Sequence, residues 1–226
     1  MVSIGPEAAT PGRRRERMEI SVELTHLGHA CVLVEANARL LIDPGTMSGF
    51  DDVRGLDAVL VTHQHADHVD VPRLGGLLAA NPGARLVVDA ETAVVADGLP
   101  EHIVVRPGDR LTFGRTTVDA LGGLHAAVYG DDPGCTNVAY LVDGFLHPGD
   151  AFVVPEQDVD VLAVPVDGPW LKLAEAVDYV RAVRPRVAVP IHEGEMTDPA
   201  KYTGMLAAFS PEGVVHRLPA NEPVAL

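Results

Sequence analysis

Lysine, cysteine and aromatic residues are all scarce in this chain of 226 residues. Only Lys172 and Lys201 are lysines, and 17 basic residues stand against 32 acidic ones, which gives a formal net charge of −15. A surface this negative repels nucleic-acid phosphates and anionic lipid head groups, so we expect neither nucleic acid nor a membrane as a partner. The two cysteines, Cys31 and Cys135, are too few for a disulfide framework and lack the paired spacing of a zinc ribbon, so we expect two buried thiols.

Long apolar runs are missing as well. No stretch of about 18 apolar residues exists, which argues against a membrane-spanning helix. Residues 13–17 read RRRER, but the first 17 residues hold no apolar segment, so they do not resemble a secretory signal peptide. We therefore expect a flexible tail over residues 1–17, a single domain over residues 18–226 and a location in the cytoplasm. The oligomeric state stays open, and a homo-oligomer is one of the possibilities.

Short apolar runs broken by Gly, Pro, Asn and Asp fill the chain from Met18 onward. Such runs predict strands at 20–24, 31–35, 39–42, 58–61, 85–88, 103–105, 110–113, 116–120, 138–142, 145–147, 161–164, 187–189 and 214–218. Helical spacing of apolar residues predicts helices at 71–80, 91–96, 171–183 and 199–209. Hairpins followed by βα units occur twice, which predicts an α/β protein in which two mixed β-sheets pack face to face with helices outside, a four-layer αββα sandwich.

The densest polar motif is THQHADHVD, at residues 62–70, directly after the predicted strand 58–61. In an extended segment alternate side chains point the same way, so His63 and His65 can bind one ion from a single loop. Asp67 and His68 then lie on the following turn and face a second position. Two ions about 3.5 to 4 Å apart are typical of two-metal hydrolases. For this motif taken alone, a solvated surface loop is the alternative.

Four further acidic or imidazole side chains follow apolar strands elsewhere in the chain. Asp43 comes after Leu40–Ile42, and Asp150 comes shortly after the predicted strand 145–147. His125 and His192 follow predicted strands in the same way. Catalytic groups gather where strand ends open into loops on one rim of a sheet, so these residues are candidates to join the histidine cluster.

These motifs together resemble one known family. THQHADH matches the HxHxDH signature of the metallo-β-lactamase fold superfamily, and the four other residues fall in the order and spacing of its remaining motifs. The segments TxLGHACVLVE (residues 25–35), LLIDPG (40–45), HPGDAF (147–152) and VPIHEG (189–194) resemble the compact branch that includes L-ascorbate 6-phosphate lactonase and many bacterial hydrolases. The resemblance covers roughly residues 20–195 and points to the metallo-β-lactamase fold.

The resemblance implies a metal centre and assigns its ligands. The first metal is expected at His63, His65 and His125, the second at Asp67, His68 and His192, and Asp150 is expected to bridge both. Asp43 would lie behind the loop and orient a ligand histidine. Nitrogen and carboxylate ligands without thiolate suit zinc, with two ions the expected number, although manganese or iron fit the same ligands.

The implied activity is hydrolysis by a metal-activated water, with Asp67 or Asp150 as the catalytic residue that orients the nucleophile and accepts its proton. The substrate would be a small-molecule ester, lactone, lactam, thioester or phosphoester. One alternative on the same fold is a mononuclear iron oxygenase that resembles the persulfide dioxygenases. A nuclease is less consistent with the chain, which offers neither the length nor the basic surface for an exosite. The sequence leaves open whether His29 and His147 contact the site or pack beneath it.

Overall fold

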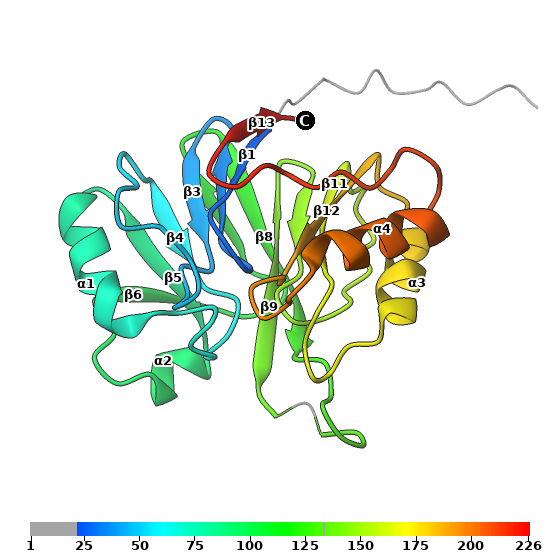
Figure 1. The fold of residues 1–226 in the computed structure, drawn as a ribbon. Coiled ribbons are helices and arrows are strands. Elements are labelled where there is room, and N and C mark those ends of the chain that lie inside the picture. Colours follow the sequence, from blue (N-terminus) through cyan, green and yellow to red (C-terminus); the bar gives the residue numbers. More distant parts are fainter. Residues whose placement is uncertain (1–21, 133) are drawn as a thin grey trace, which may run out of the picture.

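The computed structural model describes residues 22–132 and 134–226, whose strands form two sheets between outer helices (Figure 1). The first sheet has the order β13-β1-β2-β3-β4-β5-β6, built from β1 (Glu23–His26), β2 (Val32–Glu35), β3 (Arg39–Ile42), β4 (Ala58–Leu60), β5 (Arg85–Asp89), β6 (His102–Val105) and β13 (Pro223–Ala225). The second has the order β12-β11-β10-β9-β8-β7, built from β7 (Arg110–Phe113), β8 (Thr116–Leu124), β9 (Thr136–Val142), β10 (Phe145–His147), β11 (Val161–Pro165) and β12 (Val187–Ile191).

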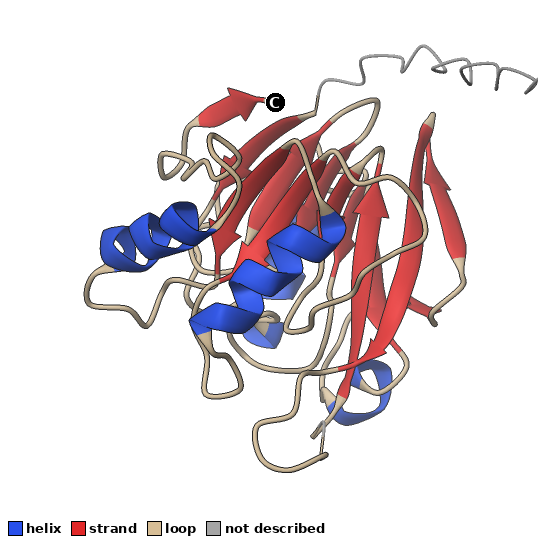
Figure 2. Cartoon of the chain, turned by 90° about the vertical axis from the view of Figure 1, so that its right-hand side faces the viewer, coloured by secondary structure: helices blue, strands red, loops and turns tan. Residues whose placement is uncertain are grey.

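Four helices within these residues form the outer layers. The first sheet is covered by α1 (Val71–Ala80) and α2 (Thr92–Val95), and the second by α3 (Leu173–Val183) and α4 (Pro199–Phe209). Figure 2 shows α3 and α4 in front of the strands of the second sheet. The predicted four-layer αββα sandwich with two mixed sheets is therefore confirmed. Among the described residues, no helix has the length and apolarity that crossing a membrane requires.

The two halves of the chain repeat one pattern, an antiparallel meander followed by parallel strands. β1, β2 and β3 pair antiparallel, and β4 to β6 continue from β3 in parallel. β7 to β10 also pair antiparallel, and β11 and β12 continue in parallel. Parallel neighbours need a crossover, which α1 supplies between β4 and β5 and α3 between β11 and β12. The carboxyl ends of β3 and β4 therefore lie at the same end of the first sheet, and those of β8, β10 and β12 lie at the same end of the second.

Successive side chains along each strand point to opposite faces of its sheet. The apolar side chains therefore pack in three cores, one between the two sheets and one between each sheet and its helices. Leu40 of β3 and Tyr140 of β9 point between the sheets into the largest core. Their neighbours in sequence point outward: Leu41 packs with Leu74 of α1, and Leu141 packs with residues of α3. Because both faces of each sheet are covered, strands such as β4 and β11 are apolar along their whole length.

Helix ends follow the capping residues in the sequence. The side chain of Asp70 accepts the backbone N–H of Arg73 at 3.3 Å, so α1 begins directly after the histidine motif and spans the predicted residues 71–80. Asp198 caps α4 in the same way. α3 begins two residues later than predicted, at Leu173, because Glu175 accepts the N–H of Lys172 at 2.8 Å and fixes the start there.

The predicted strand at 214–218 is wrong. Val215 forms only an isolated bridge to Ala188, because the chain contacts the edge of β12 at that one residue and then turns away. The last strand is β13, which pairs antiparallel with β1. The predicted tail at 1–17 and the first residues of the predicted strand 20–24 lie outside the described residues.

Candidate metal centre

Eight histidine and aspartate side chains meet where the two sheets open at the strand ends. They form two groups, and within each group one potential ligand atom of every residue lies within 4.8 Å of the others. The first group contains His63, His65, His125 and Asp150, and the second contains His29, Asp67, His68 and His192. The structure thus brings together all seven residues that the sequence predicts as ligands, and it adds His29.

The histidine motif is held in a tight loop after β4. His63 and Gln64 form a bend, and the N–H groups of His68 and Val69 both donate to the carbonyl of His65 at 2.9 Å, which closes a turn. The loop packs against Gly45, where any Cβ would overlap the carbonyl of Asp67. Gly45 is therefore required by this close approach, and the turn places Asp67 and His68 in the second ligand group while His63 and His65 belong to the first.

Hydrogen bonds fix which nitrogen of three histidines is free to bind a cation. His68 donates Nδ1–H to the carboxylate of Asp43 at 2.7 Å, and His125 donates Nδ1–H to the carbonyl of Ala126 at 2.7 Å. The hydroxyl of Thr62 donates to Asp43, so its oxygen accepts Nδ1–H of His63 at 3.0 Å. With Nδ1 protonated in each ring, the lone pair of Nε2 points into the site.

Asp43 lies directly behind the loop. Its carboxylate accepts the backbone N–H of Thr62 at 2.8 Å, the Thr62 hydroxyl at 2.8 Å and the ring of His68. Asp43 is fully buried and has a φ of 51°, a backbone conformation that aspartate tolerates better than most residues. This arrangement orients a potential ligand histidine through its far nitrogen.

Asp150 lies between the two groups. Its oxygens are 3.1 Å from Nε2 of His68, 3.4 Å from Nε2 of His125 and 3.2 Å from Nε2 of His192. Yet Nε2 of these three histidines and Oδ1 of Asp150 are buried atoms with no hydrogen-bond partner of acceptable geometry. Buried nitrogen and oxygen atoms are almost always satisfied, so this cluster of unpaired lone pairs fits bound cations.

The electrostatics of the site point the same way. Burial raises the pKa of Asp150 and Asp67, but the surrounding imidazoles outweigh burial, and both pKa values lie well below their ordinary range. Burial lowers the pKa of His192, but the carboxylates of Asp150 and Asp67, at 3.2 and 3.4 Å from Nε2, outweigh that effect and raise the pKa to about 9. The pKa of His68 is raised for similar reasons. The protons on these two rings balance the negative charge of the carboxylates, as a bound divalent cation would. Metal binding is therefore expected to release protons.

One side of the site is open to solvent. His65 is exposed and the side chain of Asp67 is 31% exposed, whereas His63 and His68 are fully buried. Trp170 is buried against the site: its Nε1–H donates to Asp150 at 3.1 Å, and its ring lies edge-on to His125 at 5.7 Å between centroids. A substrate would therefore reach the site past His65 and Asp67.

The sequence left open whether His29 contacts the site, and it gave no motif for Trp170. His29 lies in the second group, at 2.9 Å from Asp67, and the Gly-His turn in which it lies was the only signal. Trp170 has no sequence signal apart from being the single tryptophan. His147 is fully buried and donates Nε2–H to the carbonyl of Ala30 at 2.8 Å, beneath the site. The sulfur of Cys135 is 3.9 Å from Nε2 of His65.

Trp170 should report cation binding directly. Because it is the only tryptophan and lies against Asp150 and His125, its fluorescence should change in intensity and emission maximum when zinc is added to chelator-treated protein. The measurement is a fluorescence titration with zinc, and magnesium serves as a control cation that imidazole ligands disfavour. A spectrum that stays constant through saturation, as measured by metal content, would show that the indole does not face the cation site.

Comparison with known proteins agrees with this geometry. Residues 23–192 match the family model of the β-lactamase superfamily domain. Protein Rv0786c of Mycobacterium tuberculosis is 48% identical, over 84% of this chain and 93% of its own length. The UPF0173 metal-dependent hydrolase PF1764 of Pyrococcus furiosus is 29% identical, over 76% and 84%. Among solved structures, the metallo-β-lactamase fold protein YhfI of Bacillus subtilis has a TM-score of 0.67 at 17% identity, over 91% and 99%.

Proposed function

The chain belongs to the metallo-β-lactamase superfamily and is a metal-dependent hydrolase; we propose that it uses two zinc ions to hydrolyse a small-molecule substrate. The observation that supports two ions is the position of Asp150, which contacts His125 of the first ligand group and both His68 and His192 of the second. One carboxylate shared by two ligand groups is the arrangement that two-metal hydrolases use to hold a pair of ions close together.

Zinc is favoured by the donor set. Each group offers imidazole nitrogens and carboxylate oxygens, and neither includes a thiolate. Cys31 is fully buried, and burial raises the pKa of its thiol well above the ordinary value, so it does not compete as a ligand. When bound, two zinc ions would supply a water of lowered pKa and would polarise the oxygen of the bond under attack.

The chain's own residues divide the remaining tasks. Asp150 is enclosed by three histidines and by the Trp170 N–H, so it fixes the positions of the two ligand groups relative to each other. Asp67 lies on the open side, and its contacts with His29, His68 and His192 all go to Oδ2. Its Oδ1 is therefore the oxygen proposed to accept a hydrogen bond from the attacking water and orient it towards the substrate.

The proposed substrate class is a small ester, lactone, lactam, thioester or phosphoester. Hydrolysis of each requires the same two elements, an activated water and an electrophilic stabiliser. The net charge of −15 weighs against a nucleic-acid substrate, whereas two divalent ions would still attract a small anion locally. Access past His65 and Asp67 provides the route for such a molecule.

The test combines metal analysis with a substrate panel. Protein loaded with zinc should contain two ions per chain and hydrolyse at least one lactone, lactam, thioester, ester or phosphodiester at the same rate with and without oxygen. His65→Ala tests the ligand assignment. This side chain is exposed, so the variant should fold, but it should contain less metal and lose hydrolysis. One iron per chain with turnover that consumes oxygen would instead support an oxygenase and overturn the proposal.

A further inference from the structure

His29 belongs by position to the second ligand group, yet its hydrogen bonds differ from those of the other histidines. We propose that His29 is a positioning residue and not a metal ligand: its Nε2–H donates to Asp67 and holds that carboxylate towards the metal. This inference rests on the proposed metal-dependent function of the same site. It reduces the second ligand set to Asp67, His68 and His192, with Asp150 shared.

The backbone N–H of Gly194 decides the protonation of the ring. It donates to Nδ1 of His29 at 3.1 Å, and because an amide N–H can only donate, Nδ1 must keep its lone pair. The single ring proton is therefore on Nε2, which lies 2.9 Å from Oδ2 of Asp67. A nitrogen that bears a proton has no lone pair for a cation. His68 and His125 have the opposite arrangement, with Nδ1 protonated and Nε2 without a hydrogen-bond partner.

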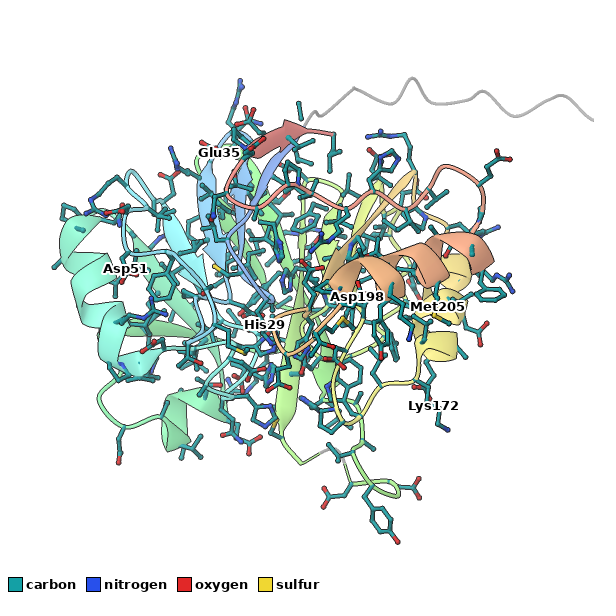
Figure 3. The ribbon with its side chains drawn as sticks, in the orientation of Figure 1. His29, Glu35, Asp51, Lys172, Asp198 and Met205 are labelled. Atoms are coloured by element: carbon teal, nitrogen blue, oxygen red, sulfur yellow. The ribbon has the colours of Figure 1, made fainter. Side chains whose placement is uncertain are left out.

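The backbone around His29 is built to keep this orientation. His29 has a φ of 53°, and its carbonyl accepts the ring of His26 at 2.8 Å and the N–H of His192 at 2.8 Å. Residue 194 must be glycine for the contact, since a Cβ there would lie 2.9 Å from Nδ1 of His29 and 3.1 Å from Cε of Met47. Figure 3 shows His29 in the middle of the molecule, away from the outer labelled residues.

The proposed role follows from the exposure of Asp67. This carboxylate is the only acidic member of the second group and its side chain is 31% exposed, whereas the His29 side chain is fully buried. A rigid donor behind a partly exposed carboxylate limits its rotamers and directs its oxygens towards the cation, as outer hydrogen bonds do at metal sites. Loss of the donor should weaken binding without removing a ligand.

Metal stoichiometry distinguishes the two roles. His29→Ala should still bind two zinc ions per chain at saturation, with the affinity of one ion reduced about 10- to 100-fold. His29→Gln, which restores an N–H donor, should recover affinity to within about threefold of the unchanged protein. His192→Ala is the reference for loss of a ligand and should saturate at one ion. Saturation of both His29 variants at one ion, as in His192→Ala, would overturn the proposal.

A second readout depends on neither activity nor the alanine variant. In ¹⁵N NMR spectra, with His29 assigned by comparison with His29→Gln, Nε2 should be protonated in the metal-free protein and should remain so after loading with ¹¹³Cd. A proton on Nδ1, together with coupling between ¹¹³Cd and Nε2, would show that His29 is a ligand. If the unchanged protein binds no cation, the proposed function fails, while the ring proton of His29 is still determined.

Gly194→Ala tests the same contact without altering the ring. The added methyl group would press on Nδ1 of His29, so this variant should keep two zinc ions and weaken one of them as His29→Ala does. Gly83→Ala is a suitable control, because this exposed glycine, like Gly194, has no positive φ, and no atom lies near the position of its Cβ. Unchanged zinc affinity in Gly194→Ala, with the folded structure retained, would contradict the positioning role.

Discussion

Replacement of Asp150 by asparagine is expected to abolish hydrolysis, with a loss in kcat/KM on the order of 10³-fold or more. The carboxylate of Asp150 contacts members of both ligand groups, at 3.1 Å from His68 and 3.4 Å from His125. Asparagine has nearly the same shape, so the variant should keep the Trp170 contact and the fold. It removes one negative charge and one candidate ligand oxygen from the position shared by the two ligand groups, so the repulsion between two bound divalent ions would be balanced less well.

Metal content should fall with the activity. We expect Asp150→Asn to contain at most one ion per chain after dialysis, measured by elemental analysis alongside thermal denaturation to confirm folding. The matched control is Asp52→Asn, which makes the same chemical change at an exposed surface position and should leave both quantities unchanged. Two tightly bound ions and normal turnover in Asp150→Asn would refute the role of Asp150 as the shared ligand.

Much of the fold could be predicted from the sequence because its signals are local. α1 was located correctly, as Asp70 and Pro72 start a helix and Asn81-Pro82-Gly83 ends it. The short hairpin between β9 and β10 follows from Asp143-Gly144. In both segments, the residues that determine the structure are adjacent in the chain, so no tertiary information was needed.

The end of the chain shows where local signals fail. Residues 214–218 have strand propensity, but a strand needs a partner along its length, and here only Val215 meets the edge of β12. β13 begins with Pro223 and has little strand propensity, yet it forms because the edge of β1 is available for pairing along Glu23–Thr25. Which edge is free is a property of the assembled sheet and cannot be read from either segment.

The site shows the same division. The motif at residues 62–70 indicates metal binding by itself, but the contribution of His29 depends on a backbone N–H that lies 165 residues further along the chain. Trp170 similarly contacts Asp150 only because the loop before α3 folds back over the ends of the second sheet. Residues that act through a partner remote in sequence have no spacing that could reveal them.

Among single substitutions, replacement of Asp43 is expected to lower the free energy of unfolding most. The carboxylate is fully buried and accepts hydrogen bonds from the N–H and hydroxyl of Thr62 and from Nδ1 of His68. Asparagine has almost the same size and also tolerates the positive φ, but its amide group places a donor against donors. Breaking a buried charged pair of this kind costs about 3 to 5 kcal/mol of unfolding free energy.

Asp43→Asn should therefore lower the melting temperature by about 6 to 20 °C, given about 2 to 4 °C per kcal/mol for a domain of this size. Differential scanning calorimetry of the metal-free protein measures this shift without interference from ligand binding. Asp57→Asn is the control, since Asp57 also accepts a backbone N–H, that of Arg39 at 2.8 Å, but is exposed, and its loss should cost less than about 0.5 kcal/mol. Equal shifts in the two variants would mean that the buried hydrogen bonds of Asp43 with Thr62 and His68 do not stabilise the loop.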